Sequence, residues 1–471
     1  VNQGYGLQIS ISGSRPAQNN FSLDGVSLTT YNGSTPGSIN GLNLGMDAVQ
    51  EFSVHSSTYS AQYGRAGGGL VNAVTKSGGN QFHGGLFYFH RNDNLDARNF
   101  FDGRQPPEFR RHQLGGSLGG PILRDKTFFF ANYEGLRQAR GNTTINTTLT
   151  AEARKGNLTT GTVAVDPVMA QVAALYPLPN GEIFGDTGLF LFANDETSRE
   201  HFVTTRIDQN VSATDKLFLR YSFDDGFKSN ETDLAVGVRS NPTRFQSAAL
   251  EETHVFSANL LNTARFGFLR TVTVDGRTVS RAPGADNPSF AFVPASGVMG
   301  TIDVTGLTTF PGGSGAANID AHAFNSFQIG DDVTWMRGPH SLKLGGRFER
   351  IRFNTDSQSR QHGDYRFRSL SQFLTNVPDR FRGQLPGTDT IRGHRQWIGA
   401  VYFQDTWRIS RRLSLDLGLR WEWTTVPTEV NGKVANLDKL SDTEMRVGDP
   451  LFDNPSLANI LPRLCLAWDL L

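Results

Sequence analysis

The sequence predicts an all-β protein whose larger part is a transmembrane antiparallel β-barrel. Three observations predict it: segments of about ten residues alternate apolar and polar side chains, short and long connections alternate, and no apolar run is long enough for a membrane helix. Residues 413–423 are the clearest segment, with large apolar or aromatic residues at odd positions and small or charged residues at even ones. Because successive side chains of a strand point to opposite faces, one face of this strand is apolar throughout.

Composition sets limits on function. The chain has 471 residues and a formal net charge of +0, and its basic residues form no stripe along the sequence, so no nucleic-acid partner is expected. The single cysteine, Cys465, cannot form an internal disulfide, and a passive side chain near a strand end is favoured over a reactive thiol. The histidines form no His-Glu-x-x-His motif; His83, His90 and His112 could cluster, but scattered polar positions are favoured.

Residues 1–80 are predicted to form a separate small domain. They are rich in Gly, Ser and Asn, which favours a mostly β or α/β domain with tight turns. Short strands are expected at 8–12, 20–23, 48–53 and 69–74. The glycine-rich stretch 64–69 is predicted to be a structural turn, because neither the Lys-Ser/Thr of a phosphate loop nor a helix follows it.

Residues 81–471 are predicted to form barrel strands. Eleven are expected, with a twelfth beginning near Pro462: 81–92, 111–122, 126–140, 200–212, 216–230, 245–257, 261–276, 324–338, 340–356, 395–410 and 413–427. Short connections are expected at 123–125, 213–215, 258–260, 339 and 411–412, and long ones at 93–110, 141–199, 231–244, 277–323, 357–394 and 428–461. Outer-membrane barrels have this arrangement of short periplasmic turns and long external loops.

The connection 141–199 is too long for a plain loop, which indicates a function or disorder. Short surface helices are expected at 151–156 and 167–176. In the strands, Leu219 and Leu417 belong to the apolar face and are predicted to contact lipid, whereas the charged residues between them face the lumen.

Two further motifs are judged structural. Residues 115–119 read Gly-Gly-Ser-Leu-Gly, but they sit within a glycine-rich strand rather than at a strand–turn–helix elbow, so a catalytic serine is not expected. Asn92, Asn94 and Asp96 have the spacing of calcium-loop ligands, but the glycine at the sixth place and the acid at the twelfth are missing. An ordinary polar loop is therefore favoured over a cation site.

The N-terminal segments resemble the plug domain of TonB-dependent outer-membrane receptors. Residues 10–26 read Ser-Ile-Ser-Gly-Ser-Arg-Pro-Ala-Gln-Asn-Asn-Phe-Ser-Leu-Asp-Gly-Val, and residues 46–54, 59–64 and 68–76 continue the resemblance. Ser12 stands where many members of the family have arginine. The resemblance implies a structural or gating role for these plug residues: Arg15, Leu23, Asp24, Gly25, Glu51, Tyr63, Gly64, Gly68, Asn72, Thr75 and Lys76.

Motifs after residue 80 resemble the Oar-like subgroup of the same family. Residues 120–122, 126–130 and 133–135 read Gly-Pro-Ile, Lys-Thr-Phe-Phe-Phe and Tyr-Glu-Gly, and Gln-Asp-Thr-Trp at 404–407 is similar to typical barrel strands of the family. The resemblance covers essentially the whole chain. It implies a late plug at 1–80 and the first half of a barrel at 81–471, with about eleven or twelve of an expected roughly 22 strands. Both ends are therefore expected to be truncated.

The resemblance implies a transporter without catalytic residues or a cofactor. An external ligand such as a siderophore, glycan, cobalamin or peptide would bind loops and plug, and a TonB-type inner-membrane energy-coupling complex would pull the plug to import it. The expected location is the outer membrane, in contact with the lipid bilayer. The alternative is a structural, adhesive or export-related Oar-like barrel without import; a secreted β-rich enzyme or lectin is a third class.

Two hypotheses concern individual residues. Arg15, Asp24, Glu51 and Lys76 are predicted to belong to a polar network between plug and barrel. Four aromatic residues of loops can stack on a ligand, although such residues are common in loops: Tyr31, Phe290, Phe292 and Phe310.

Overall fold

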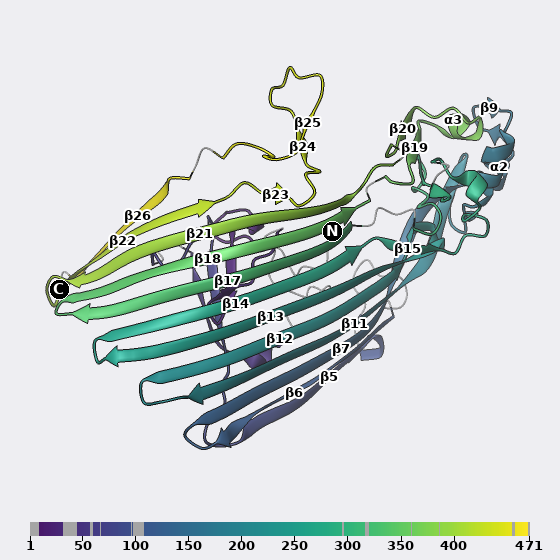
Figure 1. The fold of residues 1–471 in the computed structure, drawn as a ribbon. Helices are drawn as coiled ribbons and strands as arrows, with labels where there is room; N and C mark the ends of the chain where they lie inside the picture. The colour runs from purple at the N-terminus through teal and green to yellow at the C-terminus, as the bar shows by residue number, and fades with distance from the viewer. Residues whose placement is uncertain are drawn as a thin grey trace.

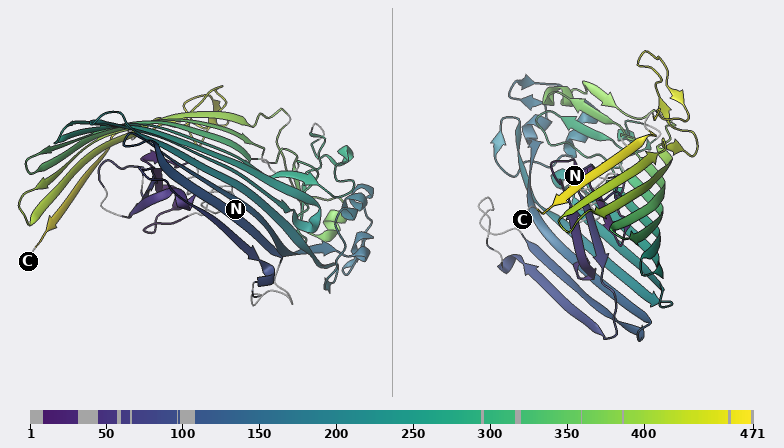
Figure 2. Two further views of the ribbon diagram at one scale, coloured as in Figure 1. Left: turned by 90° about the horizontal axis from the view of Figure 1, so that it is seen from below. Right: turned by 90° about the vertical axis from the view of Figure 1, so that its left-hand side faces the viewer.

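Two β-sheets dominate the structure, which is a computed structural model. It describes residues 9–31, 45–56, 60–65, 67–95, 97, 108–293, 296–315, 320–358, 360–385, 387–454 and 457–469. Among these residues, no helix is both long and apolar enough to cross a membrane. The larger sheet is curved, and the smaller N-terminal sheet lies on its concave side (Figures 1 and 2).

The smaller sheet has four strands in the order β2-β1-β4-β3. Their bounds are β1 Asn20–Leu23, β2 Val26–Ser27, β3 Val49–His55 and β4 Leu70–Thr75, and β1 pairs with β4 in parallel. The strand expected at 8–12 is wrong: residues 9–12 lead into a turn in which Ser12 and Gly13 have positive φ values of 54° and 73°. Left-handed backbone interrupts an extended strand. Gln8 lies outside the described residues.

The larger sheet contains twelve long strands, each antiparallel to the next, so all eleven predicted strands and the twelfth are confirmed. They are β5 His83–Asn92, β6 Phe109–Leu123, β7 Thr127–Leu149, β11 Thr187–Asn210, β12 Asp215–Glu231, β13 Gly237–Ser257, β14 Leu260–Asp275, β17 Asp320–Arg337, β18 His340–Ser357, β21 Ile391–Arg408, β22 Leu413–Thr424 and β26 Asn459–Trp468. Consecutive strands are neighbours, as in a simple meander (Figure 1).

Several strands continue beyond their predicted ends. The long connection expected at 231–244 is wrong, because β12 and β13 pair as far as Glu231 and Val238 and leave only a short turn. Likewise β7 pairs with β11 up to Leu149 and Thr187. In residues 141–149 Thr and Asn occupy both faces, so apolar alternation is absent where the strand leaves the membrane.

The connections after β7, β14 and β18 pack together into one subdomain, seen at the upper right of Figure 1. The two predicted helices are confirmed as α1 Ala151–Arg154 and α2 Pro167–Ala174. With α3 Leu370–Leu374 and short strands they share one apolar core. The short strands of the external connections are β8 Asn157–Leu158, β9 Gly161–Thr162, β10 Ile183–Phe184, β15 Arg277–Ser280, β16 Thr301–Val304, β19 Asp364–Phe367, β20 Arg380–Arg382, β23 Thr428–Glu429, β24 Ala435–Asn436 and β25 Arg446–Val447.

The predicted outward facing of Leu219 and Leu417 is confirmed. Leu219 is 48% exposed on the outer face of β12, whereas its neighbour Arg220 is 0% exposed on the inner face. On β21, Trp397 and Trp407 lie ten residues apart on the outer face. At about 3.3 Å per residue and a tilt of about 45°, ten residues span about 23–25 Å of height, which matches the apolar band of an outer-membrane barrel.

Candidate functional site: the interface between the N-terminal sheet and the barrel wall

The β1–β2 hairpin turns at Asp24 and Gly25, with Leu23 paired to Val26. Both turn residues have positive φ, 50° and 73°, as a two-residue type I′ turn requires. Asp-Gly is a preferred sequence for this turn, so its conformation follows from the sequence. The larger sheet is called the barrel wall. A Cβ at Gly25 would lie 2.5 Å from Cζ of Arg265 in this wall, so glycine also permits the close approach of the turn to the wall.

Asp24 is the centre of the interface. Its Oδ2 lies 2.8 Å from Nε of Arg220 and its Oδ1 lies 3.4 Å from Nη1 of Arg206, both arginines of the barrel wall. The carboxylate also accepts hydrogen bonds of 2.9 Å from the backbone N–H and the hydroxyl of Thr75. The Asp24 and Arg220 side chains are 1% and 0% exposed. Neither charge is therefore left uncompensated, which would be costly at this depth.

A second group of wall residues holds the backbone of the same turn. Arg347 donates to the carbonyl of Gly25 at 3.1 Å and lies 3.4 Å from Asp332. Asp332 also accepts from the Tyr402 hydroxyl and lies 3.9 Å from Arg265. The wall thus presents a network of alternating charges to the turn.

The loop between β3 and β4 is held in the same way by arginines of the last strands. Arg420 of β22 donates to the carbonyls of Ala61 and Gln62, each at 3.3 Å. Arg463 of β26 donates to the carbonyl of Tyr63 at 2.9 Å. These contacts use backbone acceptors, so they depend on the path of the loop rather than on its side chains.

Two contacts run in the opposite direction, from the N-terminal sheet to acceptors of the wall. Arg65 forms an ion pair with Glu349 of β18. The backbone N–H of Ser27 donates to Gln328 of β17 at 2.9 Å, and the Gln328 amide donates back to the Ser27 carbonyl at 2.8 Å. A cavity of about 640 Å³ lies beside these contacts, lined by charged and polar residues of both parts.

The apolar part of the interface is small. Leu28 packs on three buried residues of the wall: Leu269, Phe324 and Ile351. The ring of Tyr31 stacks on Phe353 at 4.3 Å and is tilted against His322 at 5.0 Å. Tyr31 therefore packs against the wall instead of presenting a free face to a ligand.

Of the four residues predicted to form a polar network, only Asp24 makes a charge contact with the described barrel residues. Arg15 is exposed and precedes a 3-10 helix, Pro16–Gln18. Glu51 is exposed on β3, and the backbone N–H of Lys76 donates to the Ala48 carbonyl at 2.8 Å. The sequence did not identify Arg206 and Arg220 as partners of Asp24.

Other residues predicted to have a plug role make contacts within the N-terminal sheet itself. Asn72 of β4 accepts from the Ser22 hydroxyl of β1. The Gly64 carbonyl accepts from Asn20 at 3.0 Å, and the Gly68 N–H donates to the Gln18 carbonyl at 3.1 Å. The ring of Tyr63 stacks on His55.

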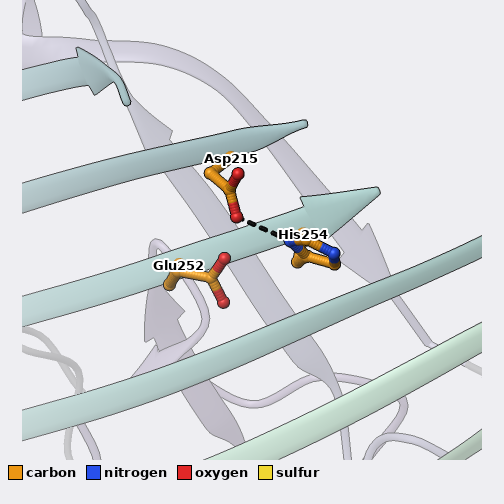
Figure 3. A group of neighbouring side chains, drawn as sticks. All are labelled: Asp215, Glu252 and His254. Carbon is orange, nitrogen blue, oxygen red and sulfur yellow. Dashed lines mark hydrogen bonds and ion pairs between the residues drawn. The ribbon is translucent and has the colours of Figure 1, made fainter. Parts of the chain in front are cut away.

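One group of side chains has the composition of a metal site. Asp215, Glu252 and His254 place one ligand atom each within 4.8 Å of one another on the outer face at the periplasmic end of β12 and β13 (Figure 3). Nδ1 of His254 lies 2.6 Å from Oδ1 of Asp215, and Thr214 donates to the same carboxylate at 2.8 Å. These hydrogen bonds account for the arrangement without an ion.

The sequence favours no metal site at two other groups, the histidines 83, 90 and 112 and the loop 92–96, and the structure assembles them only partly. The rings of His90 and His112 lie 4.6 Å apart on paired positions of β5 and β6, whereas His83 pairs with Gly119 at the other end of β5. The backbone N–H of Asn94 donates to Asn92 at 2.9 Å in a local turn; Asp96 lies outside the described residues.

The external subdomain has its own core and surface charges. Phe290 and Phe310 are 7% and 0% exposed, so they build this core and do not present rings for ligand stacking. Phe292 packs edge-on against Tyr365. On its surface, hydrogen bonds from Arg366 and then Arg368 lower the pKa of Asp379 to about 2, which keeps this carboxylate charged.

Comparison with known proteins identifies the family. Residues 74–471 match the family model described as "Outer membrane beta barrel domain". The chain belongs to this family. Outer membrane beta barrel domains lie in the outer membrane, so the predicted location is confirmed.

Relatives confirm the resemblance to TonB-dependent receptors. Over 139 residues, this outer membrane beta barrel protein is 34% identical to the TonB-dependent transporter Oar of Myxococcus xanthus, covering 28% of this chain and 12% of Oar. Its fold is similar to the outer membrane transporter YddB of Escherichia coli (TM-score 0.58, 15% identity, 100% of this chain and 54% of YddB). It is also similar to the siderophore receptor PirA of Acinetobacter baumannii (TM-score 0.51, 14% identity, 91% of this chain and 53% of PirA). The chain spans about half the length of these two structures.

Proposed function

We propose that the chain is the late plug and first barrel strands of a TonB-dependent outer-membrane receptor that imports an external ligand. The N-terminal sheet is the plug, and a TonB-type inner-membrane complex moves it. The observation that carries this proposal is the buried contact of Asp24 with Arg220 and Arg206. This contact is the central, buried point of a largely polar interface between the N-terminal sheet and the barrel wall.

A polar interface suits a plug that must move. Hydrogen bonds such as those from Arg347 to Gly25 and from Arg420 to Ala61 can be exchanged for bonds to water, so each contributes only about 1.5–3 kcal/mol net although the donor is charged. An apolar interface of the same size would resist separation more strongly, since exposed apolar surface costs about 25 cal/mol per Å². The plug is therefore held in position at rest but can be displaced by an applied force.

The external ligand enters from the side of the packed subdomain. PirA is described as a siderophore receptor, and siderophores, glycans and peptides are the ligand classes we propose here. The same subdomain supports the alternative function, a structural or adhesive barrel, because its 19-residue buried core gives the loops a fixed surface. Import requires energy-dependent movement of the plug, whereas a structural or adhesive barrel does not, so this movement distinguishes the two functions.

Energy-dependent labelling of a plug cysteine tests the proposal without knowledge of the ligand. Ala61 is 1% exposed at the interface. In the full-length protein with Cys465→Ser, we expect Ala61→Cys to react with a maleimide several times faster in energised cells than after collapse of the proton-motive force. The control Lys155→Cys, just after α1 of the external subdomain, has a side chain that is 67% exposed and should react equally in both. Energy-independent labelling of the Ala61→Cys variant would favour the structural alternative.

A disulfide between plug and wall should abolish this response. A Cβ at Gly267 of β14 would lie 2.7 Å from a methyl group of Val26, so Val26→Cys/Gly267→Cys places two thiols in contact across the interface and should form a disulfide after a small shift of β2. We expect oxidation to remove the energy-dependent labelling at position 61 and reduction to restore it. Labelling that persists in the oxidised protein would show that β2 stays in place while energy is applied.

A further inference from the structure

A row of arginines crosses four barrel strands on the lipid side. Arg270 of β14 pairs with Asn325 of β17, Asn325 pairs with Arg352 of β18, and Arg352 pairs with Arg395 of β21. Neighbouring strands lie about 4.8 Å apart, so the row is about 14 Å long. Arg350 lies two residues from Arg352 on the same face. These four arginines, with Asn325 between them, are called the arginine row.

The arginine row lies at the external edge of the apolar band. Arg395 is two residues beyond Trp397, the upper tryptophan of β21, on the same outer face. The guanidinium of Arg350 lies 4.9 Å from the centre of the Trp397 ring. Aromatic residues mark the level of the lipid headgroups, so the arginines above Trp397 lie among headgroups rather than acyl chains.

No carboxylate forms an ion pair with the row in the described part of the chain. The charge of Glu429 acts on Arg395, but without a direct ion pair. Arg270 donates to the amide oxygen of Asn325 at 2.6 Å, and Arg395 donates to that of Asn354 at 2.9 Å. Like charges directly opposite each other, as in Arg352 and Arg395, are destabilising across a strand pair unless an anion lies between them.

Other strands also have basic residues on their outer face at about the height of the arginine row. His90, His112, Arg137 and Arg199 are paired in one row across β5, β6, β7 and β11. Arg137 and Arg270 each lie ten residues beyond the first residue of their strands. At the periplasmic end the outer face presents carboxylates instead, as in the group of Figure 3. At the external height the carboxylate of Asp225 is already paired with Arg244, so the described outer face keeps a surplus of basic side chains there.

From this placement we infer that the arginine row binds the phosphate groups of a lipid headgroup in the outer leaflet. Arginine forks form paired hydrogen bonds with phosphate oxygens. Their spacing along the row suits a headgroup that carries two phosphates, and the aromatic rings below pack against the acyl chains. The occupant is thus a phosphorylated lipid of the surrounding membrane, and the site is separate from the plug.

Lipid binding by the full-length protein in detergent tests the inference. The probe is bisphosphorylated lipid A, with its dephosphorylated form for comparison. Each arginine near a charged headgroup contributes about fivefold to affinity, so Arg352→Gln/Arg395→Gln should weaken binding about 25-fold. The control Arg411→Gln/Arg412→Gln removes the same charge from a periplasmic turn and should leave affinity unchanged. The dephosphorylated probe should bind both variants and the unaltered protein equally.

A second measurement needs no variant. Raising the salt concentration tenfold should weaken binding of bisphosphorylated lipid A by the unaltered protein, while the dephosphorylated form should be insensitive. Unchanged affinity of Arg352→Gln/Arg395→Gln, an equal loss in the control, or salt-insensitive binding would each overturn the inference. Complete displacement of the lipid by millimolar inorganic phosphate would overturn it as well, because the site would then bind free phosphate.

Discussion

Replacement of Asp24 by alanine is expected to loosen the plug from the wall by about 3–5 kcal/mol, because it leaves Arg220 buried without its partner. The Thr75 N–H and hydroxyl lose their acceptor as well. In urea titrations of the full-length protein, we expect trypsin to cleave the plug of Asp24→Ala at clearly lower denaturant. The barrel should still migrate as a folded species on unheated gels.

Two further variants separate the charge effect from a general weakening of the plug. Glu152→Ala removes a carboxylate that is 62% exposed on the external subdomain, away from the N-terminal sheet, and should change plug release by less than about 0.5 kcal/mol. Asp24→Ala/Arg220→Met removes both members of the buried pair and should recover a large part of the loss. If Asp24→Ala and Glu152→Ala release the plug at the same urea concentration, Asp24 is not the central contact between plug and wall.

The barrel could be predicted from the sequence because one physical constraint acts on every residue of its strands. A strand between lipid and lumen must alternate with period two, so Leu219 and Arg220 could be assigned to opposite faces before any contact was known. The Asp24-Gly25 turn was predictable for a similar reason, since its conformation is local. Local signals also marked the helices of the subdomain: Asp166 caps α2, which begins at Pro167.

Contacts between distant segments left no such signal. The ion pair of Asp24 with Arg206 joins residues 182 positions apart, and nothing in the alternation distinguishes Arg206 from other lumen-facing arginines. The external subdomain escaped prediction because its core collects Phe290, Phe310 and Phe373 from separate loops without periodicity. For the same reason the Phe290 and Phe310 rings, which resemble exposed loop aromatics in the sequence, proved to be core residues.

Arginine in place of Leu219 should reduce barrel stability by about 2–4 kcal/mol, because this side chain lies near the bilayer midplane. On the outer face of β12 the apolar stretch runs between Asp215 and Asp225, which are ten residues apart, and Leu219 lies four residues from the first. The neighbouring outer-face positions Leu250 and Phe266 are exposed and apolar as well. No carboxylate of this row is available to pair with the new charge.

Depth, rather than charge alone, should set the size of this effect. Val272→Arg adds the same side chain to β14 two residues beyond Arg270, at the level of the headgroups, and should cost only about 0–1 kcal/mol. Refolding into lipid vesicles followed by urea titration compares Leu219→Arg with Val272→Arg directly. Equal stability of the two variants would contradict both the outward facing of Leu219 and the height assigned to the arginine row, because both follow from the position of the apolar band on the strands.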